Sequence, residues 1–381
     1  MSDDLEKLAE SEQELPPEIE EKRRKGQLRT GYTTGTCATA ATKAAMLAMI
    51  TRNPVKEITV ILPKGNTMTL KIEGCKFNDS NAECIVIKDA GDDPDVTHRA
   101  EIVSTVSWTD NPGTIEVDGG KGVGRVTKPG IGLDIGKPAI NPTPMKMIKD
   151  VVSEVAGEQL RSKGVKVIIS VPKGMELAKL TDNPRLGILG GISILGTSGI
   201  VIPYSTGSFT ASIRQGLDVA RAMGQDTVVL TTGGRSEDFA RESLKLPEHC
   251  FVQMGDFAAY SVRQSAIRGM KKAVIAGFIA KLSKMAMGMK QTHVKGSHVD
   301  MDFLASVAKE CGATEQLINE VKGANTARHV SEIVSSYKLE GYFDKLCEKV
   351  HKMMTEHTQD KIQIECVMFD FDGKVIGRYP R

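Results

Sequence analysis

The sequence has few of the features that mark nucleic-acid-binding or membrane proteins. Trp108 is the only tryptophan and aromatic residues make up 4% of the 381 residues, which argues against stacking on single-stranded nucleic acid. Fifty lysines and arginines stand against 48 acidic residues, so no net positive field attracts DNA or RNA. No run of 18 apolar residues is present. The charged first 27 residues lack the apolar core of a signal peptide. We therefore expect a cytoplasmic protein that binds neither nucleic acid nor membranes.

The sequence also lacks the spacings that identify metal and phosphate sites. Its seven cysteines are scattered and form no Cys-x-x-Cys pair, which predicts reduced thiols, no disulfides and no protein metal site. No Gly-x-x-x-x-Gly-Lys-Ser/Thr sequence occurs, which excludes a P-loop. The pattern Gly-x-Gly-x-x-Gly is not satisfied at residues 122–127, because Thr127 stands where the third glycine belongs.

A chain of this length is expected to form two domains, preceded by a polar N-terminal arm at residues 1–28. After the arm, RTGYTTGTCATAATKAAMLAMI at residues 29–50 changes from a glycine and threonine loop into an alanine-rich helix. A helix that is apolar on all sides is buried, and we expect Thr36 at its N-cap. The free N–H groups of its first turn predict an anion site. The alternative is a capped core helix without a ligand.

Residues 29–160 are predicted to form an α+β domain. Five short alternating or β-branched runs, separated by turn residues, predict an antiparallel sheet. These runs are residues 58–62, 67–72, 84–87, 101–108 and 114–117. The buried helix and a second helix near residues 144–160 are expected on one face. Asp372 and Gly373 predict a β-hairpin at residues 361–381 that edges a sheet, and whether it completes this domain is open.

Residues 161–300 show a different pattern, in which apolar runs alternate with helical segments. The runs are residues 165–171, 192–202, 227–230 and 273–277. They predict an α/β domain with a Rossmann-like, doubly wound, mostly parallel sheet. Such sheets bind ligands at the carboxyl ends of their strands, so we expect a nucleotide-like cofactor there. The acidic-Gly-x-Gly-x-Gly loop of common dinucleotide-binding and methyl-donor folds is missing here, so no motif identifies this cofactor. Residues 301–360 are predicted to be a helical extension.

Two loops of the first domain are not ordinary turns. KDAGDDPDVT at residues 88–97 holds four aspartates within seven positions, which repel one another unless a cation, an arginine or backbone donors compensate. An Asp/Pro turn, a divalent cation site and a carboxylate with a raised pKa are the alternatives. The second loop, at residues 118–136, carries seven glycines and several cationic residues. It predicts a mobile cationic rim that suits carboxylates or phosphates.

The segment QTHVKGSHVDMD at residues 291–302 concentrates histidines and aspartates. Its glycine and the lack of a helical His-x-x-x-His spacing argue against a metal site. We expect Asp300 or Ser297 to cap the next helix, with His293 and His298 solvated.

Six motifs in the order found here resemble the CbiD family of anaerobic cobalamin biosynthesis. They are LRTGYTTGTCATAATKAA, KDAGDDPDVTH, GVGRVTKPGIGLDIGKPAINPTP, GISILGTSGIV, TTGGRSE and MGDF. The resemblance covers residues 28–380. It implies methylation of C-1 of cobalt-precorrin-5B by S-adenosylmethionine to give cobalt-precorrin-6A, with the cobalt carried by the substrate.

The resemblance divides the ligands between the domains. A tetrapyrrole fringed with carboxylates needs N–H clusters and cationic loops, which the first domain offers, and the parallel sheet would hold S-adenosylmethionine. The predicted substrate-binding residues are Arg29, Gly31, Thr33, Thr34, Gly35, Thr36, Asp93, Lys121, Arg125 and Lys128. The predicted cofactor-binding residues are Gly196, Thr197, Thr231, Thr232, Gly233, Gly234, Glu237 and Asp256. Of these, Glu237 and Asp256 are the candidates for binding the ribose.

Methyl transfer from an activated donor depends mainly on positioning and on the exclusion of water. If a base removes a proton, Asp92 is the predicted residue, because the neighbouring Gly91 lets the substrate approach. Two other functions stay open: a phosphate-binding small-molecule kinase, against which the missing P-loop weighs, and a non-catalytic tetrapyrrole carrier. The partners we expect are cobalt-precorrin-5B, neighbouring pathway enzymes and further copies of the chain in a homo-oligomer.

Overall fold

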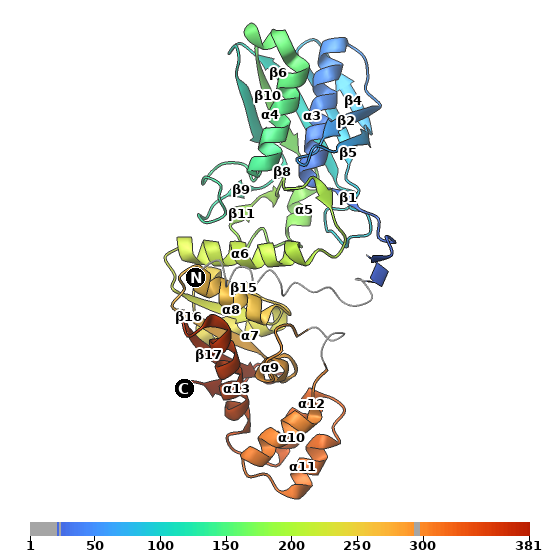
Figure 1. The fold of residues 1–381 in the computed structure, drawn as a ribbon. Coiled ribbons are helices and arrows are strands. Elements are labelled where there is room, and N and C mark those ends of the chain that lie inside the picture. Colours follow the sequence, from blue (N-terminus) through green and yellow to red (C-terminus); the bar gives the residue numbers. More distant parts are fainter. Residues whose placement is uncertain (1–20, 23, 293–297) are drawn as a thin grey trace. The chain divides into compact units, whose positions relative to one another are not determined.

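The computed structural model describes residues 21–22, 24–292 and 298–381 (Figure 1). Most of the predicted N-terminal arm, together with His293 and Ser297, lies outside these residues. The chain divides into two compact units at residue 205. We call residues 22–205 the N-terminal unit and residues 206–381 the C-terminal unit.

The N-terminal unit contains one five-stranded sheet in the order β4-β5-β6-β10-β7. Its strands are β4 (Gly74–Phe77), β5 (Asn81–Ile87), β6 (Glu101–Thr109), β7 (Ile115–Gly119) and β10 (Gly164–Ser170). All neighbours are antiparallel except β7 and β10, which are parallel. A separate antiparallel pair consists of β2 (Glu57–Ile61) and β3 (Thr67–Lys71). The five predicted strands are therefore present, and β4 was not predicted.

Helices α3 (Thr34–Thr51) and α4 (Pro142–Ala156) pack against each other and against this sheet (Figure 1). Six alanines of α3 are completely buried: Ala38, Ala40, Ala41, Ala44, Ala45 and Ala48. Because alanine extends no further than Cβ, α4 and strands β5 and β6 can all approach the helix closely. The short 3₁₀ helix η1 (Gly157–Arg161) follows α4. The predicted buried helix is confirmed.

The prediction that residues 165–171 start the parallel sheet of the second domain is wrong. These residues form β10, which pairs along its whole length with β6 and runs parallel to β7. Residues 192–202 form no long strand. They contribute only to β12 (Gly191–Ile192) and β13 (Ile200–Val201), which also belong to the N-terminal unit. An apolar run identifies a buried strand but not its partner, so the predicted boundary near residue 160 falls inside this unit.

The C-terminal unit contains the sheet β15-β14-β16-β17-β18. Its strands are β14 (Thr227–Thr231), β15 (Phe251–Gln253), β16 (Lys272–Phe278), β17 (Gln363–Phe369) and β18 (Val375–Tyr379). The first four strands in this order are parallel to their neighbours, and β18 is antiparallel to β17. The predicted C-terminal hairpin is thus confirmed, and it edges this sheet rather than the sheet of the N-terminal unit.

Helices cover both faces of the parallel sheet. Val228 and Leu230 of β14 join a large core with the helices of one face, whereas Val229 joins a smaller core with Ala240 on the other face. Helix α6 (Thr206–Ala222) precedes β14. Between the strands lie α7 (Gly234–Leu244), η2 (Glu248–Cys250), α8 (Ala258–Ile267) and α9 (Ile279–Ala286). Ala240 belongs to α7, so α7 covers the second face.

The predicted helical extension is present in the C-terminal unit. It consists of α10 (Met301–Glu310), α11 (Glu315–Lys322), α12 (Ala327–Ser336) and α13 (Tyr342–Thr358). Asp300 caps α10, as expected, by accepting the N–H of Phe303 at 3.0 Å. None of the helices in the described residues has the length and apolar character needed to cross a bilayer.

The close packing of α3 predicts that it does not tolerate larger side chains. Ala44→Leu should lower the free energy of unfolding by about 1–3 kcal/mol, because a filled core must shift to admit extra methylenes. Thr51→Ala, at an exposed position of the same helix, should change it by less than about 0.5 kcal/mol. Urea unfolding followed by circular dichroism measures both, and equal losses would mean that α3 is loosely packed.

Candidate functional site

Three segments that are far apart in the sequence meet at the N-terminal end of α3. Gly31 of β1 (Gly31–Tyr32) pairs with Val201 of β13, and the N–H of Tyr32 donates to the carbonyl of Asp89 at 2.7 Å. Gly91 has φ +69°, and a Cβ there would lie 2.1 Å from the carbonyl oxygen of Arg29. Only glycine combines this φ with so close a backbone approach. The RTGYTTGT and KDAGDDPD motifs therefore lie directly against each other.

Arg29 holds the aspartate loop in place through both its side chain and its backbone. Its guanidinium binds both carboxylate oxygens of Asp89, with Nη2 at 3.0 Å from Oδ1. Its backbone N–H donates to Oδ2 of Asp92 at 2.7 Å, and the N–H of Asp92 donates back to the carbonyl of Arg29 at 2.9 Å. The hydrogen bond from Arg29 lowers the pKa of Asp89. Asp92, the predicted base, is exposed and anchors the backbone of Arg29.

A buried lysine compensates the charge of a third aspartate. Lys88 is 1% exposed, and its Nζ lies 2.5 Å from Oδ2 of Asp95. Oδ1 of Asp95 accepts the backbone N–H and the hydroxyl of Thr97 at 2.7 and 2.6 Å. Burial raises the pKa of Asp95, but the Lys88 ammonium and the Thr97 donors outweigh it, so this pKa is lowered. Arginine, lysine and backbone donors thus compensate these carboxylates, which was one of the predicted alternatives.

Asp93 is in a different environment from the other aspartates of the loop. Its carboxylate is half-buried, and Oδ1 accepts the backbone N–H of Tyr204 at 2.7 Å. Tyr204 has φ +56°, a left-handed conformation that is costly for a bulky residue. Burial raises the pKa of Asp93. The structure therefore holds one carboxylate of this loop in a more basic state than Asp89 and Asp95.

The first turn of α3 is not an open anion site, because the chain itself binds the N–H groups of Gly35, Thr36 and Cys37. The N-cap is Thr33 rather than the predicted Thr36, and its Oγ1 accepts the N–H of Thr36 at 3.1 Å. The N–H of Gly35 donates to the carbonyl of Leu195 at 3.0 Å, and that of Cys37 donates to the carbonyl of Thr33 at 3.1 Å. The predicted N–H cradle for a substrate carboxylate is therefore filled by backbone carbonyls.

The threonine hydroxyls of this turn also hold the loop at residues 193–199. Thr34 bonds to its backbone, and Oγ1 of Thr36 donates to the carbonyl of Gly199 at 2.7 Å. A Cβ on Gly196 would lie 2.3 Å from the N-cap hydroxyl. Gly196 and Thr197, predicted to bind the cofactor, thus lie in the N-terminal unit beside the predicted substrate residues. Their run was misassigned because its contacts with α3 are not encoded in its apolar pattern.

The three predicted cationic residues of the glycine-rich loop have separate environments. Nη1 of Arg125 lies 2.9 Å from Oδ1 of Asp118, and Nζ of Lys128 donates to the carbonyl of Arg185 at 3.3 Å. Lys121 is exposed. Of the three, Lys121 therefore has the side chain most accessible to a ligand carboxylate.

The glycines in the first half of this loop serve close packing. A Cβ on Gly174 or on Gly191 would lie 2.0 or 2.1 Å from the carbonyl oxygen of Gly122. Strands β8 (Gly122–Val123) and β9 (Arg125–Val126) pair here with β12 and with β11 (Ile188–Leu189). Residues 118–124 do contain an acidic residue followed by Gly-x-Gly-x-Gly, but short strands follow it in place of a helix. This part of the loop is a packed crossing of strands.

Large apolar side chains are exposed along residues 175–204, where six of the thirteen such side chains of the described chain occur. They are Met175, Leu180, Leu189, Leu195, Ile202 and Tyr204, each at least 41% exposed. Leu195 lies against the first turn of α3, and Tyr204 contacts Asp93. Because exposed apolar patches mark binding sites, we take residues 175–204 as a candidate binding surface. The sequence analysis missed it and interpreted residues 192–202 as a buried strand.

The second candidate site is the C-terminal edge of the parallel sheet. The chain passes from β14 to β15 on one side and then to β16 on the other, and ligands bind at such a switch point. Here α7 begins after Gly233 without a side-chain cap. Thr231 is 0% exposed, and its hydroxyl has no hydrogen-bond partner among the described residues. Side chains alternate between the two faces of a strand. Thr231 therefore lies on the same face of β14 as Val229, the face that α7 covers.

The two predicted ribose-binding carboxylates at this edge are engaged to different degrees. Glu237 is 2% exposed, and its Oε1 lies 2.7 Å from Nη2 of Arg241. Asp256 is partly exposed and lies 3.0 Å from Nζ of Lys281, which also donates to the carbonyl of Thr232 at 2.9 Å. The ion pair with Arg241 gives Glu237 a structural role within α7. Asp256 instead binds Lys281, which also donates to backbone carbonyls in the loops that follow β14 and β15.

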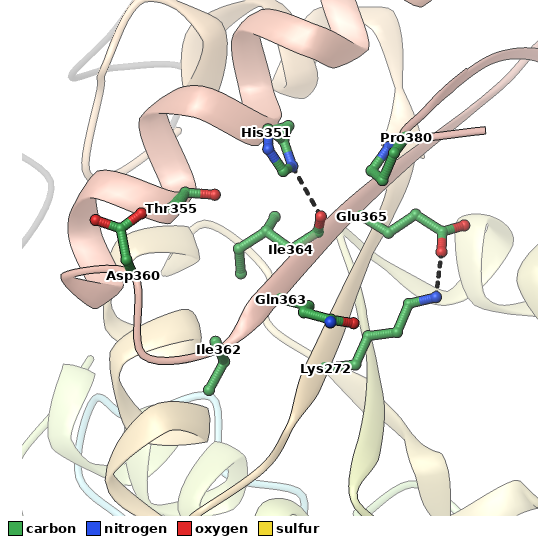
Figure 2. A pocket seen from close by; sticks show the side chains of 9 residues that line it. All are labelled: Lys272, His351, Thr355, Asp360, Ile362, Gln363, Ile364, Glu365 and Pro380. Carbon is green, nitrogen blue, oxygen red and sulfur yellow. Dashed lines mark hydrogen bonds and ion pairs between the residues drawn. The ribbon is translucent and has the colours of Figure 1, made fainter.

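A pocket of about 380 Å³ opens at the opposite, N-terminal end of β16 and β17 (Figure 2). Nζ of Lys272 lies 2.5 Å from Oε2 of Glu365, and Nδ1 of His351 lies 2.8 Å from the carbonyl oxygen of Ile364. Because its main polar groups bind one another, we assign this pocket no role in the reaction.

Two family models match this chain. One, described as CbiD, matches residues 20–203, and the other, described as the CbiD C-terminal domain, matches residues 291–380. The chain belongs to the CbiD family. The resemblance inferred from the sequence motifs is confirmed.

Relatives within the CbiD family match over nearly their whole length. The chain is 47% identical to the cobalt-precorrin-5B C(1)-methyltransferase of Priestia megaterium, over 92% of this chain and 96% of that protein. It is 48% identical to the protein of the same name from Geobacillus sp. (strain WCH70), over 94% and 98%. A crystal structure of the cobalamin biosynthesis protein (cbiD) from Archaeoglobus fulgidus has 27% identity and a TM-score of 0.37, and the match covers 73% of this chain and 89% of that chain.

The backbone contact at Gly91 gives a testable prediction for this CbiD family member. Gly91→Ala should destabilise the protein by more than the about 1–2 kcal/mol that a left-handed residue costs, because the methyl group meets the carbonyl of Arg29. Gly113→Ala is the matched control, since Gly113 has φ +73° and no atom within 4 Å of its Cβ position. Urea unfolding compares the two variants. Equal losses would show that the two motifs can separate at little cost.

Proposed function

We propose that this protein methylates C-1 of cobalt-precorrin-5B, with S-adenosylmethionine as the methyl donor, to give cobalt-precorrin-6A in anaerobic cobalamin biosynthesis. One observation carries the proposal: relatives 47% and 48% identical over more than nine-tenths of the chain are named cobalt-precorrin-5B C(1)-methyltransferase. The cobalt is part of the substrate, so the reaction needs no metal held by the protein.

We place the tetrapyrrole on the N-terminal unit. A tetrapyrrole is a large ring with apolar faces and a fringe of carboxylates. The exposed side chains of Leu195, Ile202 and Tyr204 match the ring, and the ammonium of Lys121 matches a carboxylate. The N–H groups of α3 support this surface indirectly, because they fix the loop that carries Leu195.

We place S-adenosylmethionine at the C-terminal edge of β14. The start of an uncapped helix attracts anions, and the only anionic group of this donor is its α-carboxylate. Gly233 has an extended backbone (φ 165°) and nothing within 4 Å of its Cβ position, and Gly234 is almost as open. Neither a left-handed φ nor close packing explains glycine at Gly233, whereas the approach of a ligand does. The unpartnered hydroxyl of Thr231 beneath this turn fits a site completed by a ligand.

The residues of the chain would act mainly by positioning. The donor supplies a sulfonium-activated methyl group, so the protein must bring the ring carbon and this methyl within about 3–3.5 Å and keep water out. Lys281 would keep the loops after β14 and β15 in a fixed relation while the donor binds. Binding energy spent on geometry in this way raises the rate of the chemical step.

The direct test mixes the full-length protein with cobalt-precorrin-5B and S-adenosylmethionine under anaerobic conditions. We expect a product with the mass of one added methyl, formed only when protein and donor are both present. Binding of the corrinoid without any methylation would indicate a carrier instead. Saturable binding of magnesium–ATP, with none of S-adenosylmethionine, would favour a kinase.

Gly233→Val tests the donor site. The branched side chain has room in the folded protein but would occupy the space in front of α7, so S-adenosylmethionine should bind at least about tenfold more weakly by calorimetry. The midpoint of thermal unfolding and the affinity for the corrinoid should be unchanged. An unchanged affinity for the donor would place its site elsewhere in the chain.

A further inference from the structure

Methyl transfer from a sulfonium to a neutral carbon nucleophile adds one positive charge to the substrate, and the loss of a proton removes it. The bond between sulfur and the methyl carbon breaks and its electron pair stays on sulfur, which becomes a neutral thioether. A new carbon–carbon bond forms to the substrate. If the product has the same charge as the substrate, the substrate must lose one proton, because the positive charge of the sulfonium has disappeared. A base close to the ring therefore lowers the barrier if it is ionised and placed at the binding surface.

Three of the four aspartates beside that surface are occupied by structural partners. The guanidinium of Arg29 binds both oxygens of Asp89, and Lys88 and Thr97 bind both oxygens of Asp95. The carboxylate of Asp92 is exposed and holds the backbone N–H of Arg29. Protonation of Asp89 or Asp95 would break a strong ion pair. Asp89 and Asp95 are therefore poor proton acceptors.

Asp93 combines the position and the environment that the others lack. It is half-buried, and the backbone N–H of Tyr204 fixes only its Oδ1, at 2.7 Å. Tyr204 and Ile202 expose their side chains on the same segment, at 41% and 44%. A carboxylate beside exposed apolar side chains would lose more water when a flat ring covers them, and this loss makes the carboxylate more basic. The left-handed backbone of Tyr204 shows that the fold keeps this amide in place despite a conformational cost.

We propose that Asp93, and not Asp92, accepts the proton that the substrate loses during methyl transfer. This inference rests on the proposed function. Oδ1 stays bonded to Tyr204, which orients the group, and Oδ2 takes the proton. The neutral acid then returns the proton to water after the product leaves. Methylation and proton transfer balance without any further reactant.

The charges around Asp93 predict the pH dependence of the reaction. Burial raises the pKa of Asp93 and the charge of Asp95 adds to this effect, whereas the N–H of Tyr204 and the ammonium of Lys88 lower it, and the net shift is upward. The base works only when ionised. The rate should therefore fall on acidification at a pH above the usual range of an aspartate.

The test compares Asp93→Asn with Asp92→Asn in the full-length protein under single-turnover conditions. Asp93→Asn should lower the rate of methylation by about 10²-fold or more and remove the acidic limb of the pH profile, while the affinities for cobalt-precorrin-5B and S-adenosylmethionine change less than about threefold. Asp92→Asn should lower the rate less than tenfold and keep the limb. Asp110→Asn, at an exposed turn, is the control for the loss of one negative charge.

A second readout detects proton removal without methylation. With the thioether product S-adenosylhomocysteine in the donor site and D₂O as solvent, the wild-type protein should exchange one substrate hydrogen for deuterium faster than protein-free buffer does. Asp93→Asn should exchange at the rate of the buffer. If this variant does not fold, Asp93→Glu replaces it, and it should keep the acidic limb with a reduced rate.

The outcomes separate this inference from the proposed function. If the folded wild-type protein forms no methylated product, the proposed function itself is wrong. Normal methylation by the wild type, with an unchanged rate and pH profile in Asp93→Asn, would overturn only the assignment of the base. Loss of the limb in Asp92→Asn, with Asp93→Asn unaffected, would return the role to Asp92.

Discussion

The arrangement of the N-terminal unit depends on how the chain pairs the N–H groups in the first turn of α3. A buried helix cannot leave these donors unpaired, because each one would cost about 1–3 kcal/mol. The chain brings the loop at residues 193–199 onto the helix, and the carbonyl of Leu195 accepts one of the donors. The same segment continues into β13, which pairs with β1, and to Tyr204, whose N–H donates to Asp93. The surface that we assign to the tetrapyrrole thus adjoins the contacts that cap this core helix.

The same requirement explains which sequence predictions failed. The glycine and threonine content of residues 31–36 correctly indicated a helix start with many donors and acceptors. It could not show that their partners lie about 160 positions further along the chain, because a hydroxyl serves a ligand and a backbone carbonyl equally well. The sequence predicts Thr36 as the N-cap, whereas the observed N-cap is Thr33, the residue that directly follows β1. The local sequence pattern does not show which distant residues pair with this turn.

Hydrophobic periodicity in the sequence predicts which residues form strands. It does not predict which strands pair with one another. Five strands of the N-terminal unit and the parallel strands β14 and β16 follow from alternation or apolar runs. Strand β10 has the apolar character of a parallel strand, yet it lies between an antiparallel and a parallel neighbour. Only the face with Val165, Val167 and Ile169 is fully buried, and the apolar character of the run does not show which strands it pairs with. Among the candidate site residues, Asp93 illustrates a similar limit, since its burial depends on the amide of Tyr204, which the aspartate-rich pattern does not contain.

The surroundings of each glycine in the structure distinguish glycines that close packing requires from glycines that packing does not explain. Gly122, Gly174 and Gly191 lie where a Cβ would penetrate a neighbouring backbone, so the fold alone requires them. Gly31 and Gly91 belong to the same class, although their motif first suggested access for a ligand. Gly233 has neither a left-handed φ nor a close neighbour, so its lack of a side chain is unexplained by the protein itself. The glycines that the fold does not need are therefore better markers of a ligand site than the glycine-rich loops that attract attention in the sequence. This criterion supports our proposal of a donor site at the end of β14, whereas the glycines of residues 119–124 serve packing.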